Sequence, residues 1–203
     1  MLQTQTVVPD LMELLKKIMT EERFSSYYLV GGTSLALQIG HRNSINIDLF
    51  GDKNIDFELF ISILNQMGKT IVSKNSTNIL KAEVDNVKVD FVNYRYPLLA
   101  KPLTIDGIRM VSKIDIAAMK LNAIAGRGSK KDFIDLYFLL KDFTLQEMLD
   151  FYNKKYFDGS LFMVQKSLSY FKEANLQPEP KMFLKFYWDK CKGKIIEEVI
   201  KLQ

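Results

Sequence analysis

Apolar residues recur at helical spacing near the start of the chain, and this pattern predicts its first helix. After Pro9, a residue favoured in the first helical turn, spacings of three and four separate the apolar residues Leu11, Leu14, Leu15 and Ile18. A similar pattern over 57–67 predicts another helix. Between these two segments we expect a strand at 27–30, a sharp turn at Gly31-Gly32, a helix over 33–38 that ends at Gly40, and a strand at 45–50.

The hydrophobic period changes to two after residue 68, which predicts strands. Asp85-Asn86 is typical of a tight hairpin turn, and the alternating segments around it are 69–74, 78–84 and 87–94. From Ser112 onward no strand is expected, and helices are predicted over about 113–126, 130–142, 144–155, 158–173 and 180–201. We therefore expect an α+β domain over 1–105, with a mixed sheet flanked by helices, and a helical bundle over 106–203.

The composition narrows the classes of function without selecting one. Lysine and arginine exceed aspartate and glutamate by 28 to 24, so a polyanionic ligand is permitted but not required. The single cysteine, Cys191, excludes an intrachain disulfide, and with only one histidine a zinc site is not expected. No secretion signal is recognisable, and no apolar run approaches the roughly 18 residues of a membrane span. We expect a cytoplasmic protein with no membrane partner.

Polar side chains share one face of two predicted strands. In 45–50 the alternation places Asn46 and Asp48 on the same face, opposite the apolar residues, and in 87–91 it places Asp90 on the polar face. If the two strands are neighbours, these oxygen ligands converge, as a magnesium site requires. The alternative is that each aspartate is only a solvated residue on the polar face of a strand.

The glycine turn before the second predicted helix is a candidate phosphate site. Unpaired N–H groups and the helix dipole at a helix N-terminus favour anions, which makes Gly31, Gly32, Thr33 and Ser34 candidate nucleotide-binding residues. A Gly-Gly pair alone is a weak signal, since most such pairs only turn the chain. The order of strand, glycine turn, helix, polar strand and later aspartate is more specific.

In this order and spacing, the chain resembles the AbiEii/AbiGii nucleotidyltransferase-like toxins. Their first motif, a glycine turn followed by an Asp-x-Asp pair, is similar to GGTSLAL at 31–37 and GHRNSINIDLF at 40–50. The strand with the third carboxylate is similar to VKVDF at 87–91, and the helical motifs are similar to 116–127 and 131–137. The similarity covers roughly 27–141 and implies a nucleotidyltransferase-like fold for the first domain.

The resemblance also implies roles for individual residues. Asp48 and Asp90 would be the catalytic carboxylates, and magnesium would be held by Asn46, Asp48 and Asp90. One departure matters, because the chain has Asn46 where the family pattern has the first aspartate of the pair. An amide oxygen can still bind a cation but brings no negative charge. Whether the protein is an active enzyme therefore stays open.

Lys120, in the predicted helix 113–126, and Arg127, directly after it, lie on the same helix face. By resemblance, Lys120 would approach the nucleotide phosphates with Arg127 beside it, and replacing Lys120 by alanine should weaken nucleotide binding without unfolding the protein. A solvated lysine is the alternative. Asp132 and Asp135 share a helix face and either serve the active cleft or pair with Arg127 or Lys131.

Other charged and aromatic residues have two interpretations each. His41 is structural or catalytic, and Arg42 either binds a phosphate or pairs with Asp48 or Asp90. Aromatic residues at near-helical spacing favour core packing, and they are Phe143, Phe151, Tyr152, Phe157, Phe162 and Phe171. A basic C-terminal face is primarily a solvated surface and secondarily an RNA contact, and its residues are Lys181, Lys185, Lys190, Lys192 and Lys194.

The resemblance implies two functional hypotheses. The first is a nucleotidyltransferase that binds a nucleoside triphosphate and magnesium and transfers nucleotides to an RNA or protein acceptor. Such a protein would be the toxin of a bacterial toxin–antitoxin or phage-defence pair, with an antitoxin protein as partner. The second is a catalytically degenerate nucleotide-binding or protein-interaction module, which Asn46 favours.

Overall fold

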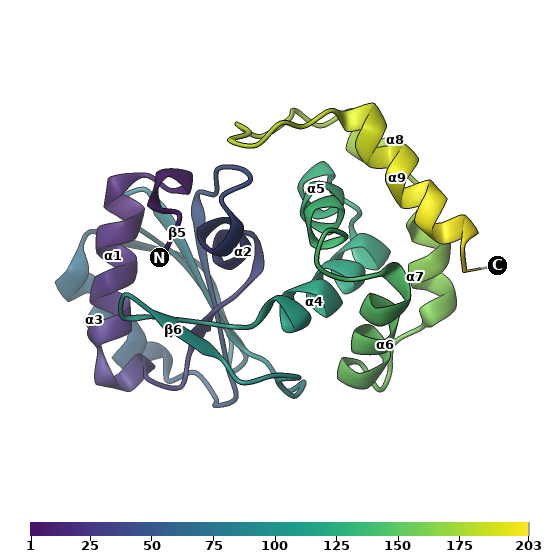
Figure 1. Ribbon diagram of the computed structural model, residues 1–203. Helices are drawn as coiled ribbons and strands as arrows, with labels where there is room; N and C mark the ends of the chain where they lie inside the picture. The colour runs from purple at the N-terminus through teal and green to yellow at the C-terminus, as the bar shows by residue number, and fades with distance from the viewer. Residues whose placement is uncertain (203) are drawn as a thin grey trace. The chain divides into compact units, whose positions relative to one another are not determined.

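The computed structural model describes residues 1–202 and divides into two compact units (Figure 1). The first unit comprises Met1–Tyr96 and Pro102–Val111, and the second comprises Pro97–Lys101 and the chain from Ser112 onward. The sequence pattern places the division after residue 105, inside the part of the chain that the contacts assign to the first unit. Over residues 1–202, no helix combines the length and the apolar character needed to cross a membrane.

A mixed sheet forms the centre of the first unit. Among the described residues it is seven-stranded, with the order β3-β4-β5-β2-β1-β7-β6. The strands are β1 (Tyr28–Leu29), β2 (Asn46–Gly51), β3 (Thr70–Asn75), β4 (Ile79–Val84), β5 (Val87–Asn93), β6 (Leu103–Ile105) and β7 (Ile108–Met110). β2 pairs in parallel with β5 and antiparallel with β1, and β4 pairs antiparallel with both β3 and β5. The expected α+β class with a mixed sheet is confirmed.

The apolar face of this sheet is covered by helices that the hydrophobic pattern predicts. They are α1 (Pro9–Thr20) and α3 (Phe57–Met67), which Figure 1 shows on one side of the sheet. The inward residues of β2 and β5 are fully buried against them, and a cluster of aromatic rings fills the centre with Phe24, Tyr27, Phe60 and Phe91. The unit also contains α2 (Gly31–Ile39) and the short 3-10 helices η1 (Thr4–Thr6) and η2 (Glu22–Phe24).

The hairpin of β4 and β5 turns where the sequence predicts it. Asp85 and Asn86 have φ angles of 46° and 67°. Asn and Asp tolerate this left-handed region better than other residues with a side chain, and a two-residue turn of this kind matches the twist of the flanking strands. The turn therefore determines the register of the hairpin, which matters for the site described below.

A second hairpin, β6 and β7, was not expected, because the sequence pattern reads 100–112 as a connection. Its strands have only three residues each, which is too few for a periodic hydrophobic pattern. β7 joins the sheet by pairing in parallel with β1. The available signal was Asp106-Gly107, whose φ angles of 50° and 79° again fit a tight turn. Arg109 of β7 donates to the carbonyl oxygens of Met19, Phe24 and Tyr27, at 2.6, 3.0 and 3.3 Å.

The second unit is helical over the described residues. Its helices are α4 (Lys113–Gly126), α5 (Lys130–Leu139), α6 (Leu145–Lys155), α7 (Leu161–Ser167), α8 (Lys172–Asn175) and α9 (Trp188–Ile200). The predicted helix over 158–173 is two shorter helices, and the one over 180–201 begins only at Trp188. Pro178 and Pro180 lack the backbone N–H donors that a helix needs, and 176–187 is irregular, with a turn and bends. The core prediction is wrong for Phe157 and Phe162, whose exposed fractions are 83% and 69%.

A buried ion pair ties the connecting segment 97–101 to the helices. The ammonium of Lys155, fully buried, lies 2.8 Å from Oδ1 of Asp115 and donates to the carbonyl of Pro97 at 2.6 Å. Asp115 also accepts from the backbone N–H groups of Leu99 and Ala100 and from the hydroxyl of Ser112. These hydrogen bonds compensate the cost of burying the two charges, as a stable buried pair requires.

Candidate active site

The two candidate catalytic carboxylates are directly opposite each other on adjacent strands. β2 and β5 run in parallel, and the residue paired with Asp48 is Asp90. Both residues are on the polar face of the sheet, because their neighbours Ile47, Leu49 and Val89 are fully buried on the other face. The condition that the sequence left open, that the two strands are neighbours, is therefore met, and their aspartates share a face. That the two carboxylates come close enough to share a magnesium ion stays a prediction.

Asp48 also lies against the glycine turn. Gly31 has a φ of 67°, and a Cβ added at this position would lie 3.2 Å from Oδ2 of Asp48. Glycine adopts this backbone conformation without strain, and its missing side chain leaves room for the carboxylate. The carbonyl of Asp48 accepts from the N–H of Val30 at 2.9 Å, which connects β2 to the start of α2. The carboxylate thus lies at the N-terminus of a helix, where the dipole favours negative charge.

Arg42 brings a positive charge to the same helix start. A Cβ at Gly32 would clash with Nη2 of Arg42, so the guanidinium would have to shift if this residue had a side chain. Arg42 has an exposed fraction of 2% and donates from Nη1 to the carbonyl of Asn43 at 2.8 Å. His41 is fully buried beside it. At the start of α2, the carboxylate of Asp48 therefore lies against Gly31, and the guanidinium of Arg42 lies against Gly32.

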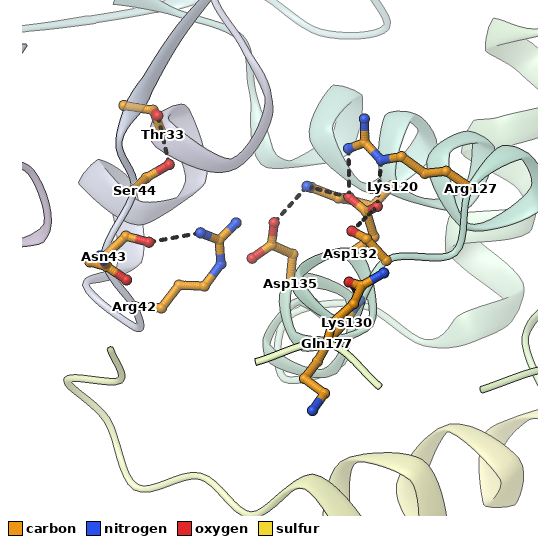
Figure 2. A network of polar contacts seen from close by, with 11 residues as sticks. Thr33, Arg42, Asn43, Ser44, Lys120, Arg127, Lys130, Asp132, Asp135 and Gln177 are labelled. Atoms are coloured by element: carbon orange, nitrogen blue, oxygen red, sulfur yellow. Dashed lines mark hydrogen bonds and ion pairs between the residues drawn. The ribbon is translucent and has the colours of Figure 1, made fainter. Parts of the chain in front are cut away.

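The hydroxyl groups of the turn have partners inside the first unit. Thr33 is fully buried, and its hydroxyl is hydrogen-bonded to Ser44 Oγ at 2.7 Å (Figure 2). The same hydroxyl donates to the carbonyl of Asn46. Ser34 is also buried, and its Oγ accepts from Gln38 at 3.1 Å. A phosphate would therefore be bound by backbone N–H groups of the first helical turn, which lack acceptors within the helix, rather than by these hydroxyls.

Two lysines on the polar face of the sheet change the charge of the site. The ammonium of Lys81 on β4 lies 2.7 Å from Oδ2 of Asp90. Lys88 on β5 is paired with Asn46. Asn46 is the residue that replaces the first aspartate of the family pattern. Sequence reasoning missed both lysines. The Asp85-Asn86 turn predicts the pairing of Lys81 with Asp90, because partners in a hairpin count outward from its turn.

The donor set fits one hard cation better than two. Among residues 1–202, no group of three or more His, Cys, Asp or Glu residues could hold a metal ion. The available oxygens are those of Asp48, Asp90 and the amide of Asn46. Magnesium is commonly bound by one or two carboxylates with phosphate oxygens and water completing its six ligands. The residues present therefore fit a cation that arrives with a nucleotide.

A second cluster of charges lies within the helical unit. The ammonium of Lys120 is 3.0 Å from Oδ1 of Asp132 and 2.6 Å from Oδ2 of Asp135, and these residues are almost completely buried. Arg127 binds Asp132 with two hydrogen bonds of 2.8 and 3.0 Å, and Ser129 donates a third of 2.6 Å. Figure 2 shows the two carboxylates directed at the ammonium of Lys120. The pairing of Arg127 with Asp132 was one of the two sequence alternatives.

The electrostatics of this cluster are dominated by its cations. Burial by itself would raise the pKa of Asp132, but Lys120, Arg127 and Ser129 together outweigh burial and hold the pKa below the ordinary value of 3.8. Asp132 is therefore ionised, and the cluster of two carboxylates and two cations is formally neutral. The alternative interpretation, a solvated Lys120, is wrong. Its expected contact with nucleotide phosphates stays a prediction.

The comparison with protein families identifies the chain. The model of the family described as "Nucleotidyl transferase AbiEii toxin, Type IV TA system" matches residues 13–186. The chain belongs to the AbiEii nucleotidyl transferase toxin family. Its resemblance to that family, inferred from the glycine turn and the aspartate strands, is confirmed.

One protein is similar to this AbiEii family member in sequence, and two solved structures are similar to it in fold. An uncharacterized protein of Aquifex aeolicus (strain VF5) is 38% identical over 169 residues, covering 80% of this chain and 82% of that protein. The crystal structure of JHP933 from Helicobacter pylori has a TM-score of 0.61 at 16% identity and covers 95% of this chain and 88% of that one. MenT4, a nucleotidyltransferase toxin from Mycobacterium tuberculosis H37Rv, has a TM-score of 0.60 at 15% identity, with 96% and 83% covered.

Proposed function

We propose that this AbiEii family member binds a nucleoside triphosphate with magnesium and transfers a nucleotide to an acceptor. The observation that carries the proposal is the register of β2 and β5, which pairs Asp48 with Asp90 on the polar face of the sheet, with Asp48 against Gly31. A pair of carboxylates, one of which lies against a helix N-terminus, would provide cation ligands close to phosphate-binding N–H groups. Neither group alone would handle a triphosphate, which needs both.

In this proposal each part of the site has a separate task. The N–H groups of the first turn of α2 bind phosphate oxygens, and the guanidinium of Arg42 beside Gly32 favours a negatively charged ligand there. Asn46, Asp48 and Asp90 would hold the magnesium ion, which when bound neutralises charge on the phosphates. Asp48 and Asp90 also repel a free anion. The nucleotide is therefore expected to bind far better with magnesium than without it.

The biological role proposed here rests on the family. A member of a nucleotidyl transferase toxin family is expected to be the toxin of a toxin–antitoxin or phage-defence pair and to have an antitoxin protein as its partner. MenT4, similar in fold, also bears the name of a nucleotidyltransferase toxin. For the acceptor we choose RNA over protein, because the excess of basic residues is concentrated in one segment, as described in the next subsection.

Asn46 and Lys81 favour a second candidate, a nucleotide-binding module that has lost transfer activity. Compared with the family pattern, Asn46 removes one negative charge, and Lys81 neutralises part of another at Asp90. Both changes lower the attraction for a divalent cation. A cation carried by the nucleotide can still dock, whereas one held mainly by protein carboxylates would be bound weakly.

One experiment separates the two candidates. Purified protein is incubated with total RNA, each of the four labelled nucleoside triphosphates and magnesium at a fixed concentration, and labelled RNA is counted. The active-enzyme proposal expects transfer that is lost in Asp48→Asn. The degenerate candidate expects nucleotide binding without transfer, and a gain of metal affinity or of transfer in Asn46→Asp.

A matched control removes the effect of net charge. Asn65 is an exposed residue of α3, so Asn65→Asp makes the same change of charge away from the site. Transfer that is undiminished in Asp48→Asn would refute the site. Robust transfer by the unmodified protein, with no improvement in Asn46→Asp over Asn65→Asp, would remove the main support for the degenerate candidate.

A further inference from the structure

The excess positive charge of the protein is concentrated in 14 residues. Residues 181–194 contain five lysines and one aspartate, so their net charge of +4 equals that of the whole chain. The same segment includes four aromatic residues, among them the chain's only tryptophan: Phe183, Phe186, Tyr187 and Trp188. It comprises the end of the irregular connection between α8 and α9 and the first half of α9 (Figure 1).

Lysines and aromatic rings are interleaved on this surface. Tyr187 lies between two lysines, with the ammonium groups of Lys185 and Lys190 at 5.7 and 5.2 Å from the centre of its ring. Lys181 lies 5.2 Å from the ring of Phe183, and Lys192 lies 5.8 Å from that of Trp188. We call these residues the basic aromatic surface, defined as Lys181, Lys185, Tyr187, Trp188, Lys190 and Lys192.

The aromatic part of the surface is held in place from beneath. Trp188 donates from Nε1 to Asn175 Oδ1 at 2.8 Å and packs edge-on against Phe171 and Phe133, with ring centres 5.9 and 6.2 Å apart. The nearly buried Lys130 lies 5.2 Å from the same ring. Tyr187, next to it in the chain, has an exposed fraction of 52%. An anchored ring beside an exposed ring is a preorganised platform, which reduces the entropy lost when a ligand stacks on it.

Most of the positive charge on the surface is not neutralised by the protein. Over residues 1–202, no carboxylate is within ion-pair distance of Lys181, Lys185 or Lys190. Lys192 pairs with Asp189 at 2.9 Å. Lys194 pairs with two glutamates of α9, and for this reason it is not part of the surface.

We propose that the basic aromatic surface binds single-stranded RNA. Unpaired bases stack on aromatic rings, and the phosphates between them are neutralised by lysines spaced along the strand. The cation–π contacts of the exposed lysines are weak, so a base can take the ring of Tyr187 while Lys185 and Lys190 move to the flanking phosphates. An acidic peptide would use the lysines but leave the exposed ring without a partner. That this surface binds RNA does not depend on the proposed function. That it holds the acceptor during nucleotide transfer does rest on the proposed function.

The single tryptophan provides a direct readout at the surface. The full chain, without nucleotide, is titrated with a single-stranded RNA of about 12 nucleotides, within the usual site size, and with the same sequence as a duplex. Trp188 fluorescence and the anisotropy of labelled RNA are recorded at several salt concentrations. We expect quenching of Trp188 by the single strand and weaker binding of the duplex.

Two substitutions at the surface test its two components. Lys185→Gln with Lys190→Gln should lower the salt dependence, reducing the slope of log K against log salt by about 1.4, because each phosphate contact contributes about 0.7. Tyr187→Ala should weaken binding by about fivefold or more through lost stacking. The matched control is Lys16→Gln with Lys53→Gln, two exposed lysines of the first unit, which makes the same change of charge.

The outcomes separate this proposal from the proposed function. Absence of binding, equal affinity for single strand and duplex, equal affinity for an acidic peptide, or equal loss in the control variant would each overturn the RNA-binding surface. Transfer to RNA that continues unchanged in the surface variants would overturn it as the acceptor site while leaving the transferase intact. Binding at the surface without transfer, even in Asn46→Asp, would overturn the transferase proposal and leave the RNA-binding surface standing.

Discussion

Lys120 has an exposed fraction of 5%, and its replacement by methionine removes an ammonium group that lies 2.6 Å from Asp135 and 3.0 Å from Asp132. Methionine approximately conserves the volume, so the change removes charge and hydrogen bonds rather than creating a large cavity. Asp132 keeps Arg127 and Ser129 as partners, whereas Asp135 loses the cation nearest to its Oδ2. Breaking a buried pair by removing one partner costs about 3–5 kcal/mol, because the remaining charge is left in the interior.

The structure thus changes the expectation drawn from sequence for this lysine. Replacement of Lys120 was expected to weaken nucleotide binding without unfolding the protein, whereas its burial predicts a large loss of stability. Because Asp132 retains Arg127, we expect the lower end of the range, a decrease of about 3 kcal/mol in the free energy of unfolding at pH 7. Nucleotide binding by this variant must therefore be measured where circular dichroism shows that it is still folded.

The pH dependence gives this prediction a distinct signature. In the unmodified protein the pKa of Asp132 is lowered, since Lys120 and its other partners outweigh burial, so its contribution to stability is present above about pH 4 and is lost as the pH falls through the folded-state value. In Lys120→Met, Asp132 loses the ammonium group that lowers its pKa most, so less of this contribution is present to be lost as the pH falls. The stability difference between the two proteins should therefore shrink from pH 7 towards pH 4.

Urea denaturation at several pH values, followed by circular dichroism, measures this difference. The matched control is Lys113→Met on the same helix, whose pair with Asp142 at 2.7 Å is more than one-third exposed on both sides. This control should lose no more than about 1 kcal/mol. If Lys120→Met loses no more than the control at pH 7, or if its deficit grows on acidification, the reasoning from burial is refuted.

Three further predictions concern other charged or special positions. Lys81→Met should free Asp90 and raise the affinity for Mn²⁺, measured by calorimetry without nucleotide, by up to about fivefold, and no change would show that the lysine does not compete with a cation. Gly31→Ala places a side chain at a φ of 67° against Asp48, so it should lower the free energy of unfolding by about 1–2 kcal/mol and weaken nucleotide binding. An unchanged midpoint of urea denaturation would contradict this. Lys155→Met breaks a fully buried pair and should lower the free energy of unfolding by about 3–5 kcal/mol, so a loss below 1 kcal/mol would be inconsistent with its burial.

The alternation of β2 and β5 in the sequence was enough to place the candidate carboxylates on the polar face of the sheet. The alternation of side chains between the two faces of a strand depends only on the backbone. Once the strand formed, Asp48 therefore had to lie on the other face from Ile47 and Leu49. The helical spacing after Pro9 and the Asp85-Asn86 turn are similarly local, and both elements are where the pattern predicts them. The identity of Asn46, and with it the doubt about a complete metal site, is also readable without a structure.

Other features were decided by the tertiary structure, because they depend on which elements pack together. The strands β6 and β7 are too short to have a period of their own, and they form because β7 pairs with β1. The hydrophobic spacing around 180–187 resembles a helix, but Pro178 and Pro180 lack backbone donors, and the helix begins only at Trp188.

The burial of charge was also decided by packing. Lys120 on one helix meets Asp132 and Asp135 on the next, and Lys155 meets Asp115 from a helix 40 residues away in the chain. A lysine on a helix face looks the same in the sequence whether water or a carboxylate lies above it. Its free energy differs by several kcal/mol between the two environments, because desolvation and pairing depend on neighbours that only the folded chain supplies.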